Sequence, residues 1–272
     1  MSAERAARAK RTSAQGGIHP TAIVDPGARI GADVEIGPYS VIGPQVEIGQ
    51  RSRIGPHTVI TGDTRLGTNN RVFQFTSLGD APQDKKYGGE PTRLEIGDNN
   101  TIREFCTLNR GTAQDAGTTR IGNDNWIMAY VHIAHDCQIG NRTVFANNAQ
   151  LAGHVHVGDD AILGGFTVVH QFVRIGAHSI SGMGTILLQD VPPYIKVSGN
   201  PSAPYGINVE GLRRRGFSAD AIAGLKRAYR TLYRSSLTLD EAQRELVEQC
   251  KECPDVQLLR AFIAAASRGI VR

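Results

Sequence analysis

Aliphatic residues recur at every sixth position along the first part of the chain. They are Ile18, Val24, Ile30, Ile36, Ile42, Ile48, Ile54, Ile60, Leu66, Val72 and Leu78. A helix repeats every 3.6 residues and a strand every two, so a period of six indicates a longer unit that returns one large apolar side chain to the same place. This period is typical of a parallel β-helix built from hexapeptide repeats. The sequence therefore predicts a mainly β fold of this kind over residues 18–198.

Two further positions of each unit support the same fold. Glycine follows the aliphatic residue in six units, where a Cβ would obstruct a tight corner and where glycine can take dihedral angles that other residues avoid. These glycines are Gly31, Gly37, Gly43, Gly49, Gly55 and Gly67. Small or β-branched residues come four positions after the aliphatic one, as Val34, Ser40, Val46, Ser52, Thr58 and Thr64. We expect them to occupy a second inward position in a narrow prism.

The period is interrupted twice. Between residues 78 and 96 the expected inward positions hold Asp84 and Glu90, which cannot face an aliphatic core without partners, so residues 79–95 are predicted to form a loop. A thirteen-residue interval before Ile121 predicts a second loop over residues 109–120. Loops that leave a rigid scaffold often carry function.

A C-terminal α-helical domain is predicted for residues 199–272, after an irregular connection. Capping signals predict three helices, from Ser218 to about Ser235, from Thr238 with its capping-box partner Glu241, and from Pro254 to about Gly269. The first helix carries an apolar stripe that we expect to pack in a core, made of Ile222, Leu225, Ala228, Tyr229 and Leu232.

Composition narrows the functional classes. Hydrophobic residues make up 40% of the 272 residues but aromatic residues only 6%, as expected for a thin aliphatic interior. The net charge of +4 is modest, and no nucleic-acid-binding motif interrupts the repeats, so nucleic acid is disfavoured as a partner, whereas an acidic protein partner remains possible. Residues 1–17 are predicted to be a disordered basic tail, with no apolar core that would suggest a secretory signal or a membrane span.

The four cysteines are Cys106, Cys137, Cys250 and Cys253. They do not form the framework of a secreted disulfide-rich protein, so the cytoplasm is the expected location. The pair Cys250 and Cys253 could supply half of a zinc site, but free thiols are favoured because no second pair exists.

Histidines provide the candidate chemistry. If three six-residue sides make one coil, residues eighteen apart stack, so Gly153 lies above His135, and His154 lies above Asp136. We expect four histidines to gather along one edge of the prism, namely His132, His135, His154 and His170. Such convergence indicates a site.

The predicted site has the groups needed for acyl transfer. A neutral imidazole can remove a hydroxyl proton, and a glycine N–H one coil away can stabilise an oxyanion. No Ser or Cys stands in a triad-like setting, which favours direct attack by the acceptor over an acyl-enzyme. A zinc site shared between subunits is an alternative. It is disfavoured because Asp136 more simply serves to orient His135.

Several sequence segments together resemble one enzyme family over residues 19–272. They are Gln83-Asp-Lys-Lys-Tyr-Gly-Gly-Glu-Pro-Thr, His132-Ile-Ala-His-Asp-Cys, Ala146-Asn-Asn-Ala, Leu151-Ala-Gly-His-Val, His170-Gln-Phe, Gln189-Asp-Val-Pro-Pro-Tyr and Asn208-Val-Glu-Gly-Leu-Arg-Arg-Arg-Gly-Phe. In these segments the chain resembles the UDP-N-acetylglucosamine 3-O-acyltransferases, which begin lipid A synthesis in Gram-negative bacteria. Hexapeptide repeats alone would indicate only a superfamily.

This resemblance implies a left-handed β-helix, a homotrimer, and a site between adjacent coils at a subunit boundary. His135 would be the general base on the sugar 3-hydroxyl, Asp136 would orient it, and the Gly153 N–H would bind the oxyanion. Asp84 and Lys86 match residues that contact the sugar and the phosphopantetheine arm. The nucleotide end would be held by Asn208, Glu210, Arg214 and Arg215, while the cleft would be lined by His132, His154, His170 and Gln171. No bound cofactor or metal is implied.

The acyl donor implied by the resemblance is a (R)-3-hydroxyacyl group on the 4′-phosphopantetheine of acyl carrier protein, an acidic protein. A basic surface that could dock it is predicted from Arg213, Arg214, Arg215, Lys226, Arg227, Arg230 and Arg234.

Asn109 stands where relatives often have His, and no role is assigned to it. Met183, stacked above Gly165 and Asn147, is expected to shorten the acyl groove and favour a medium-length chain.

Three other functions remain open at this point. A related N-acyltransferase carries an extra domain before its repeats, whereas the repeats begin at Ile18 in this chain. A hydratase of the carbonic anhydrase kind would need bound zinc. A non-catalytic scaffold would tolerate His135→Ala without loss of any activity.

Overall fold

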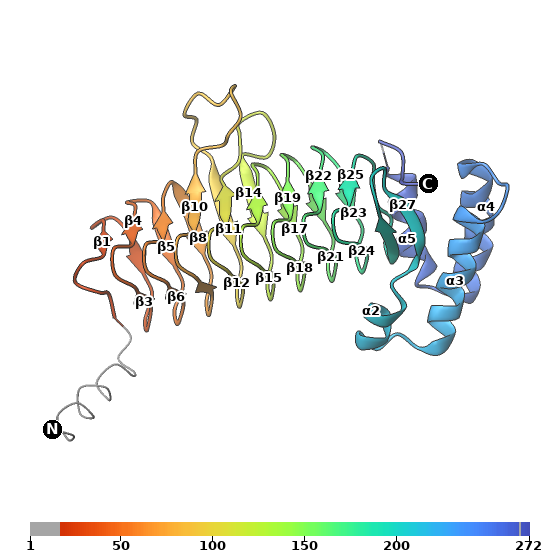
Figure 1. The fold of residues 1–272 in the computed structure, drawn as a ribbon, viewed down its shortest axis with the longest axis horizontal. Coiled ribbons are helices and arrows are strands. Elements are labelled where there is room, and N and C mark those ends of the chain that lie inside the picture. The colour runs from red at the N-terminus through yellow and green to blue at the C-terminus, as the bar shows by residue number, and fades with distance from the viewer. Residues whose placement is uncertain (1–16, 267) are drawn as a thin grey trace, which may run out of the picture.

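The computed structural model describes residues 17–266 and 268–272, so most of the predicted basic tail lies outside the described residues. The chain winds into a left-handed parallel β-helix with three sheets, followed by helices at the end opposite the N-terminus (Figure 1). Residues 18 apart lie in register, as in the pairing of Ile133 with Leu151 and of Leu151 with Val169. The hexapeptide prediction is therefore confirmed.

Each sheet contains one side of every coil. Sheet 1 consists of β1 (Ile23–Val24), β4 (Val41–Ile42), β7 (Val59–Ile60), β10 (Ser77–Asp80), β13 (Thr107–Asn109), β16 (His132–Ile133), β19 (Gln150–Leu151), β22 (Val168–Val169) and β25 (Ile186–Leu187). Sheet 2 consists of β2 (Arg29–Ile30), β5 (Val46–Ile48), β8 (Asp63–Leu66), β11 (Arg93–Ile96), β14 (Thr118–Ile121), β17 (Gln138–Ile139), β20 (His156–Val157) and β23 (Arg174–Ile175).

Sheet 3 completes the prism and extends past it. It consists of β3 (Glu35–Ile36), β6 (Arg53–Ile54), β9 (Arg71–Val72), β12 (Thr101–Ile102), β15 (Trp126–Ile127), β18 (Val144–Phe145), β21 (Ile162–Leu163), β24 (Ile180–Ser181), β26 (Ile195–Ser198) and β27 (Ala203–Ile207). The corners between the sheets are named here the 1–2 edge, the 2–3 edge and the 3–1 edge.

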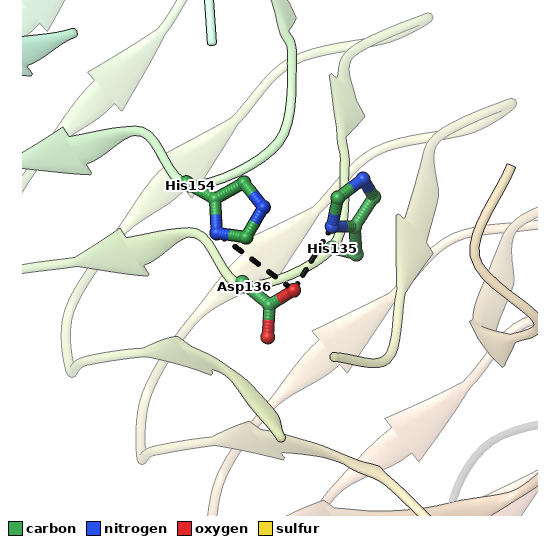
Figure 2. Close-up of side chains that lie close together, drawn as sticks. All are labelled: His135, Asp136 and His154. Atoms are coloured by element: carbon green, nitrogen blue, oxygen red, sulfur yellow. Dashed lines mark hydrogen bonds and ion pairs between the residues drawn. The ribbon is translucent and has the colours of Figure 1, made fainter. Parts of the chain in front are cut away.

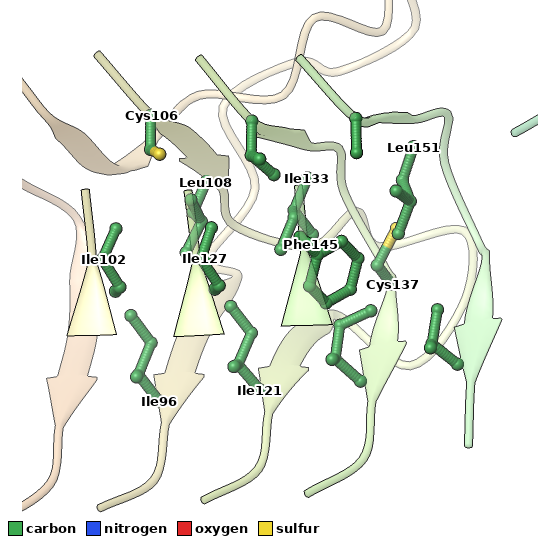
Figure 3. Packing of buried hydrophobic residues seen from close by; sticks show 14 of the residues in the cluster. Ile96, Ile102, Cys106, Leu108, Ile121, Ile127, Ile133, Cys137, Phe145 and Leu151 are labelled. Carbon is green, nitrogen blue, oxygen red and sulfur yellow. The ribbon is translucent and has the colours of Figure 1, made fainter. Parts of the chain in front are cut away.

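The interior is a column of aliphatic side chains. Ile102, Leu108, Ile127 and Ile133 have no exposed surface (Figure 3), and full burial of each such side chain contributes roughly 1.5–3 kcal/mol. The second inward position is also buried, as predicted, in Val34, Ser40, Val46, Ser52, Thr58 and Thr64. The first coil differs, because Ile18 remains 47% exposed where no preceding coil covers it.

Five of the six glycines after the aliphatic residues are explained by contact and not by dihedral angle; the exception is Gly43, whose Cβ would meet no atom closer than 3.4 Å. A Cβ on Gly31 would lie 2.6 Å from the backbone nitrogen of Gln50, and one on Gly49 would lie 2.5 Å from the carbonyl carbon of Gly67. The six glycines have ordinary φ values. The left-handed conformation instead falls three residues after the aliphatic position, as at Asp33 (φ 56°) and Tyr39 (φ 59°). The expectation of unusual glycine dihedrals was wrong.

Both loops are shorter than predicted. Strand β10 continues to Asp80 and β11 begins at Arg93, because Leu94 turns inward and is fully buried. The first loop is therefore residues 81–92. Strands β13 and β14 likewise extend into the second interruption and leave residues 110–117 as the second loop. The two loops project from the same side of the prism (Figure 1), and Arg110 donates hydrogen bonds to the Tyr87 hydroxyl at 3.0 and 3.1 Å.

The expected boundary at residues 198 and 199 was wrong. Strand β27 pairs antiparallel with β26, so sheet 3 continues into the segment predicted to be irregular. The last residues also return to the coil, where the Asp190 N–H donates to the Gly269 carbonyl at 3.1 Å and the Val271 N–H donates to the Asp190 carbonyl at 2.9 Å. The C-terminal region therefore caps the open end of the β-helix.

In the part of the chain that the structure describes, four helices follow β27, namely α2 (Val209–Arg214), α3 (Ala219–Tyr233), α4 (Leu239–Glu252) and α5 (Val256–Ala264). The Ser218 cap, the Thr238–Glu241 capping box and the buried stripe of α3 are confirmed. Helix α2 was not predicted. Helix α5 begins after Pro254, with Asp255 at its N-cap, and ends five residues before Gly269 because residues 269–271 pair with the coil.

Candidate functional site

His135 and Asp136 lie at the 1–2 edge, in the turn between β16 and β17. The His135 Nδ1 atom is 2.9 Å from Asp136 Oδ2 (Figure 2). Asp136 has the left-handed φ of 59° that recurs at these corners, a conformation that Asp tolerates better than most residues. The Asp136 side chain is completely buried, whereas the His135 side chain is 14% exposed. A nearly buried imidazole is thus paired with a buried carboxylate.

The second loop fixes the Asp136 carboxylate. The Thr112 N–H donates to Oδ1 at 3.0 Å and to Oδ2 at 3.1 Å, and the Thr112 hydroxyl donates to Oδ2 at 2.7 Å. Burial by itself would raise the pKa of Asp136, but hydrogen bonds from His135 and Thr112 outweigh it and lower that pKa. An ionised Asp136 accepts the Nδ1 proton of His135, which leaves the Nε2 lone pair of His135 free to act as a base.

Gly153 stacks one coil above His135, as predicted. A Cβ at this position would lie 2.4 Å from His135 Cε1 and 2.7 Å from His135 Nε2, so only glycine fits against the ring. Gly153 is buried and its carbonyl accepts the Phe172 N–H at 3.1 Å. Across residues 17–266 and 268–272 no acceptor is paired with the Gly153 N–H. A backbone N–H without an acceptor in the chain is a suitable donor for an oxygen that gains negative charge.

His154 lies on the same edge, above Asp136. Its ring meets the His135 ring edge-on, with centroids 5.0 Å apart and an interplanar angle of 88°. It stacks on Phe172 at 4.4 Å. The His154 Nδ1 atom is 2.7 Å from Asp115 Oδ2 and 3.9 Å from Asp136 Oδ2. Two imidazoles, each with a carboxylate partner, therefore face one another.

The other predicted cleft residues follow the same edge. His132 lies in β16, where its Nδ1 atom is 2.7 Å from the Thr107 hydroxyl, and burial lowers the pKa of His132. His170 and Gln171 are exposed at the turn after β22, next to Phe172. The edge therefore presents histidines on three successive coils.

Asp84 and Lys86 lie in the first loop. The Asp84 carboxylate accepts the Lys86 N–H at 3.0 Å. In the described part of the chain, neither residue forms a hydrogen bond or ion pair with His135 or Asp136. The loop base is held by Asn109, whose amide nitrogen donates to the Ala81 carbonyl at 3.0 Å. This contact gives Asn109 a structural explanation.

The predicted nucleotide-binding residues lie at a different edge. Asn208 caps α2 and donates to the His178 carbonyl at 3.0 Å, and Arg215 Nε is 2.8 Å from Asp160 Oδ1 at the 2–3 edge. Asn208, Arg214 and Arg215 line a cavity of about 310 Å³ together with Asp160 and His178. Glu210 is exposed and pairs with Arg213.

Met183 lies at the third corner, the 3–1 edge, between β24 and β25. Its side chain is 78% exposed. Within one chain, then, the sequence-predicted residues are distributed over three edges: the histidines at one, the arginines at the second, and the methionine at the third.

A metal site is geometrically conceivable at His135, Asp136 and His154, whose candidate ligand atoms lie within 4.8 Å of one another. The Nδ1 atoms of both histidines are, however, already hydrogen-bonded to the carboxylates of Asp136 and Asp115. Only the Nε2 atom of each ring therefore remains available, either for proton transfer or for a metal.

Neither the α2–α5 helices nor any other helix among the described residues has the length and apolarity to cross a bilayer.

All four cysteines are free thiols. Burial raises the pKa of Cys106 and of Cys137 to about 12. Neither thiol is therefore suited to act as a nucleophile.

Comparison with known proteins agrees with this geometry. Residues 27–62 and 118–153 match the family described as bacterial transferase hexapeptide (six repeats), and residues 190–271 match UDP-N-acetylglucosamine O-acyltransferase, domain 2. The acyl-[acyl-carrier-protein]–UDP-N-acetylglucosamine O-acyltransferase of Thiobacillus denitrificans is 62% identical, with 94% of this chain and 99% of that protein covered. The protein of the same name from Janthinobacterium sp. is 59% identical over the same shares.

Solved structures give the same result. The UDP-N-acetylglucosamine O-acyltransferase of Moraxella catarrhalis superposes with a TM-score of 0.92 at 48% identity, covering 94% of this chain and 99% of that one. The UDP-N-acetylglucosamine acyltransferase of Francisella novicida has a TM-score of 0.92 at 42% identity, with 94% of each chain covered. The chain therefore belongs to the acyl-[acyl-carrier-protein]–UDP-N-acetylglucosamine O-acyltransferase family.

Proposed function

We propose that this protein transfers a (R)-3-hydroxyacyl group from acyl carrier protein to the 3-hydroxyl of UDP-N-acetylglucosamine, the first step of lipid A biosynthesis. The names of its relatives support both substrates. The observation that carries the mechanism is the contact of His135 with the Asp136 carboxylate on one side and with Gly153 on the other. The four free thiols are consistent with action in the reducing cytoplasm.

In the proposed reaction, His135 Nε2 removes the proton of the sugar 3-hydroxyl as its oxygen attacks the thioester carbonyl carbon. The carbonyl oxygen becomes an oxyanion that the Gly153 N–H stabilises. Collapse of this intermediate breaks the carbon–sulfur bond, and the His135 imidazolium returns the proton to the departing phosphopantetheine thiol. Asp136 stabilises the imidazolium. The buried cysteines support direct attack without an acyl-enzyme.

The separation of site residues over three edges supports a homotrimer with shared sites. In a closed ring, the 1–2 edge of one subunit can meet the face of the next subunit that carries Arg214, Arg215 and Met183. A second observation also favours self-association. The 3–1 edge carries a continuous row of exposed stacked rings, with centroids 4.8–5.2 Å apart, formed by Tyr39, His57, Phe75, Phe105 and Tyr130. A monomer rarely exposes so long an apolar row.

Roles for the remaining residues follow from this arrangement. Arg214 and Arg215, with Asn208 and Glu210, would hold the nucleotide diphosphate, since guanidinium groups pair well with phosphate oxygens. Asp84 and Lys86 would contact the sugar and the phosphopantetheine arm. His132, His154, His170 and Gln171 would line the cleft, and Met183 would close the acyl groove.

Acyl carrier protein would dock on the basic surface near α2 and α3. All seven predicted cations are exposed there, namely Arg213, Arg214, Arg215, Lys226, Arg227, Arg230 and Arg234. An exposed cationic surface increases the association rate with an acidic partner.

Two experiments test these proposals. Incubation with UDP-N-acetylglucosamine and 3-hydroxyacyl carrier proteins of graded length should give O-acylated product by mass spectrometry, and no product with any donor would contradict the proposed reaction. Mixing His135→Ala and Arg215→Ala subunits should restore activity in about a quarter of the sites of a randomly assembled trimer. Mixtures as inactive as either variant would contradict the shared site.

A further inference from the structure

The second loop, residues 110–117, contacts both imidazole–carboxylate pairs of the site. The backbone N–H and the hydroxyl of Thr112 donate hydrogen bonds to the carboxylate of Asp136, and the Asp115 carboxylate contacts the ring of His154. We propose that this loop positions the catalytic base His135 and the adjacent cleft residue His154, with Thr112 and Asp115 as the two positioning residues. This inference rests on the function proposed above.

Thr112 acts through Asp136. Its hydroxyl donates to Oδ2, the same oxygen that lies 2.9 Å from His135 Nδ1. Asp136 is held from the other side as well, because its N–H donates to the Thr119 hydroxyl at 2.8 Å. The carboxylate cannot rotate without breaking several hydrogen bonds. Its orientation in turn fixes the ring of His135 and the direction of the Nε2 lone pair.

Asp115 acts on His154. The carboxylate is 49% exposed, whereas the His154 side chain is only 13% exposed. Acceptance of the Nδ1 proton by Asp115 leaves His154 Nε2 as a hydrogen-bond acceptor in the cleft. Stacking on Phe172 at 4.4 Å and the edge contact with His135 fix the plane of the ring. Asp115 therefore selects the tautomer, while packing selects the orientation.

Glycines hold the loop close to these groups. A Cβ on Gly111 would lie 2.3 Å from the Thr118 backbone nitrogen and 2.8 Å from Asp136 Oδ1. Gly117 has a left-handed φ of 66°. The two ends of the loop can therefore approach each other and Asp136 closely only with glycine at position 111. The N-terminal end of the loop therefore lies directly against the Asp136 carboxylate.

The test compares conservative variants of the full-length protein in the acyl-transfer assay. Thr112→Val keeps the side-chain shape and removes the hydroxyl, and we expect kcat to fall about tenfold with an unchanged KM for UDP-N-acetylglucosamine. Thr112→Ser should restore kcat. Asp115→Ala should instead raise this KM about fivefold, because it acts on a residue that lines the cleft. Gln114→Ala, an exposed change in the same loop, is the matched control.

Partial unfolding would lower kcat and leave KM unchanged, which is also the result expected for Thr112→Val, so the folded fraction of each variant is measured by circular dichroism. A normal kcat in Thr112→Ser and a raised KM in Asp115→Ala then identify positioning. A double-mutant cycle of Asp115→Ala with His154→Ala should give a non-additive result. In Asp115→Ala, nitrogen NMR of the His154 ring should record a shift of the proton between Nδ1 and Nε2 relative to the unmodified protein. Additive effects, an unchanged His154 tautomer, or Thr112→Ser as impaired as Thr112→Val would overturn the inference.

These outcomes are separable from failure of the proposed function. If His135→Ala keeps the turnover of the unmodified protein, the general-base mechanism fails whatever the loop variants do. If His135→Ala is inactive while Thr112→Val and Asp115→Ala match the unmodified protein, only the role of the loop is refuted.

Discussion

Replacement of Gly153 by alanine should displace His135, the proposed catalytic base, without changing any charged group. The added Cβ would lie 2.4 Å from His135 Cε1 and 3.0 Å from His135 Nδ1. Carbon atoms reach their favourable separation at about 3.5 Å, so the ring must retreat by about 1 Å. The backbone N–H of residue 153 remains present in the variant. The change therefore tests the position of the ring and not the loss of the oxyanion donor.

The magnitude follows from the contacts behind the ring. The His135–Asp136 bond is 2.9 Å long, and a retreat of about 1 Å takes it past the length at which a hydrogen bond persists. Asp136 cannot follow, because Thr112 holds both of its oxygens. Loss of a hydrogen bond to a charged group costs about 1.5–3 kcal/mol. We therefore expect kcat to fall by about 10- to 100-fold.

The assay measures kcat with saturating UDP-N-acetylglucosamine and acyl carrier protein. Gly43→Ala is the matched control, because its Cβ would meet no atom closer than the Thr61 Cα at 3.4 Å, and its activity should be unchanged. A kcat for Gly153→Ala within about twofold of the unmodified protein, with the ring of His135 in its original place in a crystal structure, would refute the reasoning.

Three further predictions concern Asp136, Asp190 and Met183. The pKa of Asp136 is lowered below its ordinary value in the folded protein, so its carboxylate stabilises the fold above the unfolded-state pKa, and this stability is lost as pH falls through the folded-state pKa. In denaturant titrations Asp136→Asn should lower the unfolding free energy by about 1–3 kcal/mol at pH 7, and the loss should shrink as the pH falls through the acid range. A loss of the same size at every pH would contradict this. Burial raises the pKa of Asp190, and among the described residues its Oδ2 atom is buried without a partner, so folding stability is lost as the pH rises above the unfolded-state pKa. Asp190→Asn should therefore raise the melting temperature at pH 7 but not at pH 3. A melting temperature lowered by this substitution at pH 7 would contradict the prediction. Met183→Gly should extend the acyl chain accepted, as measured with donors of graded length, and an unchanged length profile would count against a groove closed by Met183.

The period of six was enough to predict most of the fold, because one inward side chain per unit fixes the register of every strand. It also predicted that Gly153 stacks on His135, since the spacing of eighteen needs no further information. The glycine dihedrals were mispredicted because the same residue type satisfies two constraints, close approach and unusual φ. Only coordinates distinguish the two at Gly31 or Gly49.

The contacts that the second loop makes could not be predicted from the sequence. Its thirteen-residue interval breaks the register, so nothing in the spacing relates Thr112 to Asp136 or Asp115 to His154. The contact of Phe172 with His154 could have been predicted from the period, because Phe172 lies eighteen residues after His154 and stacks on it. Hairpin β26–β27 was also missed, since its five-residue strand contains Pro204 and Gly206, which disfavour regular strands.

The central claim is that His135 removes the proton of the sugar hydroxyl. Its most direct test is the turnover of His135→Ala relative to the unmodified protein, with O-acylated UDP-N-acetylglucosamine measured by mass spectrometry and folding checked by circular dichroism. The account predicts a fall of about 10²- to 10⁴-fold. A folded His135→Ala protein with undiminished turnover would contradict it.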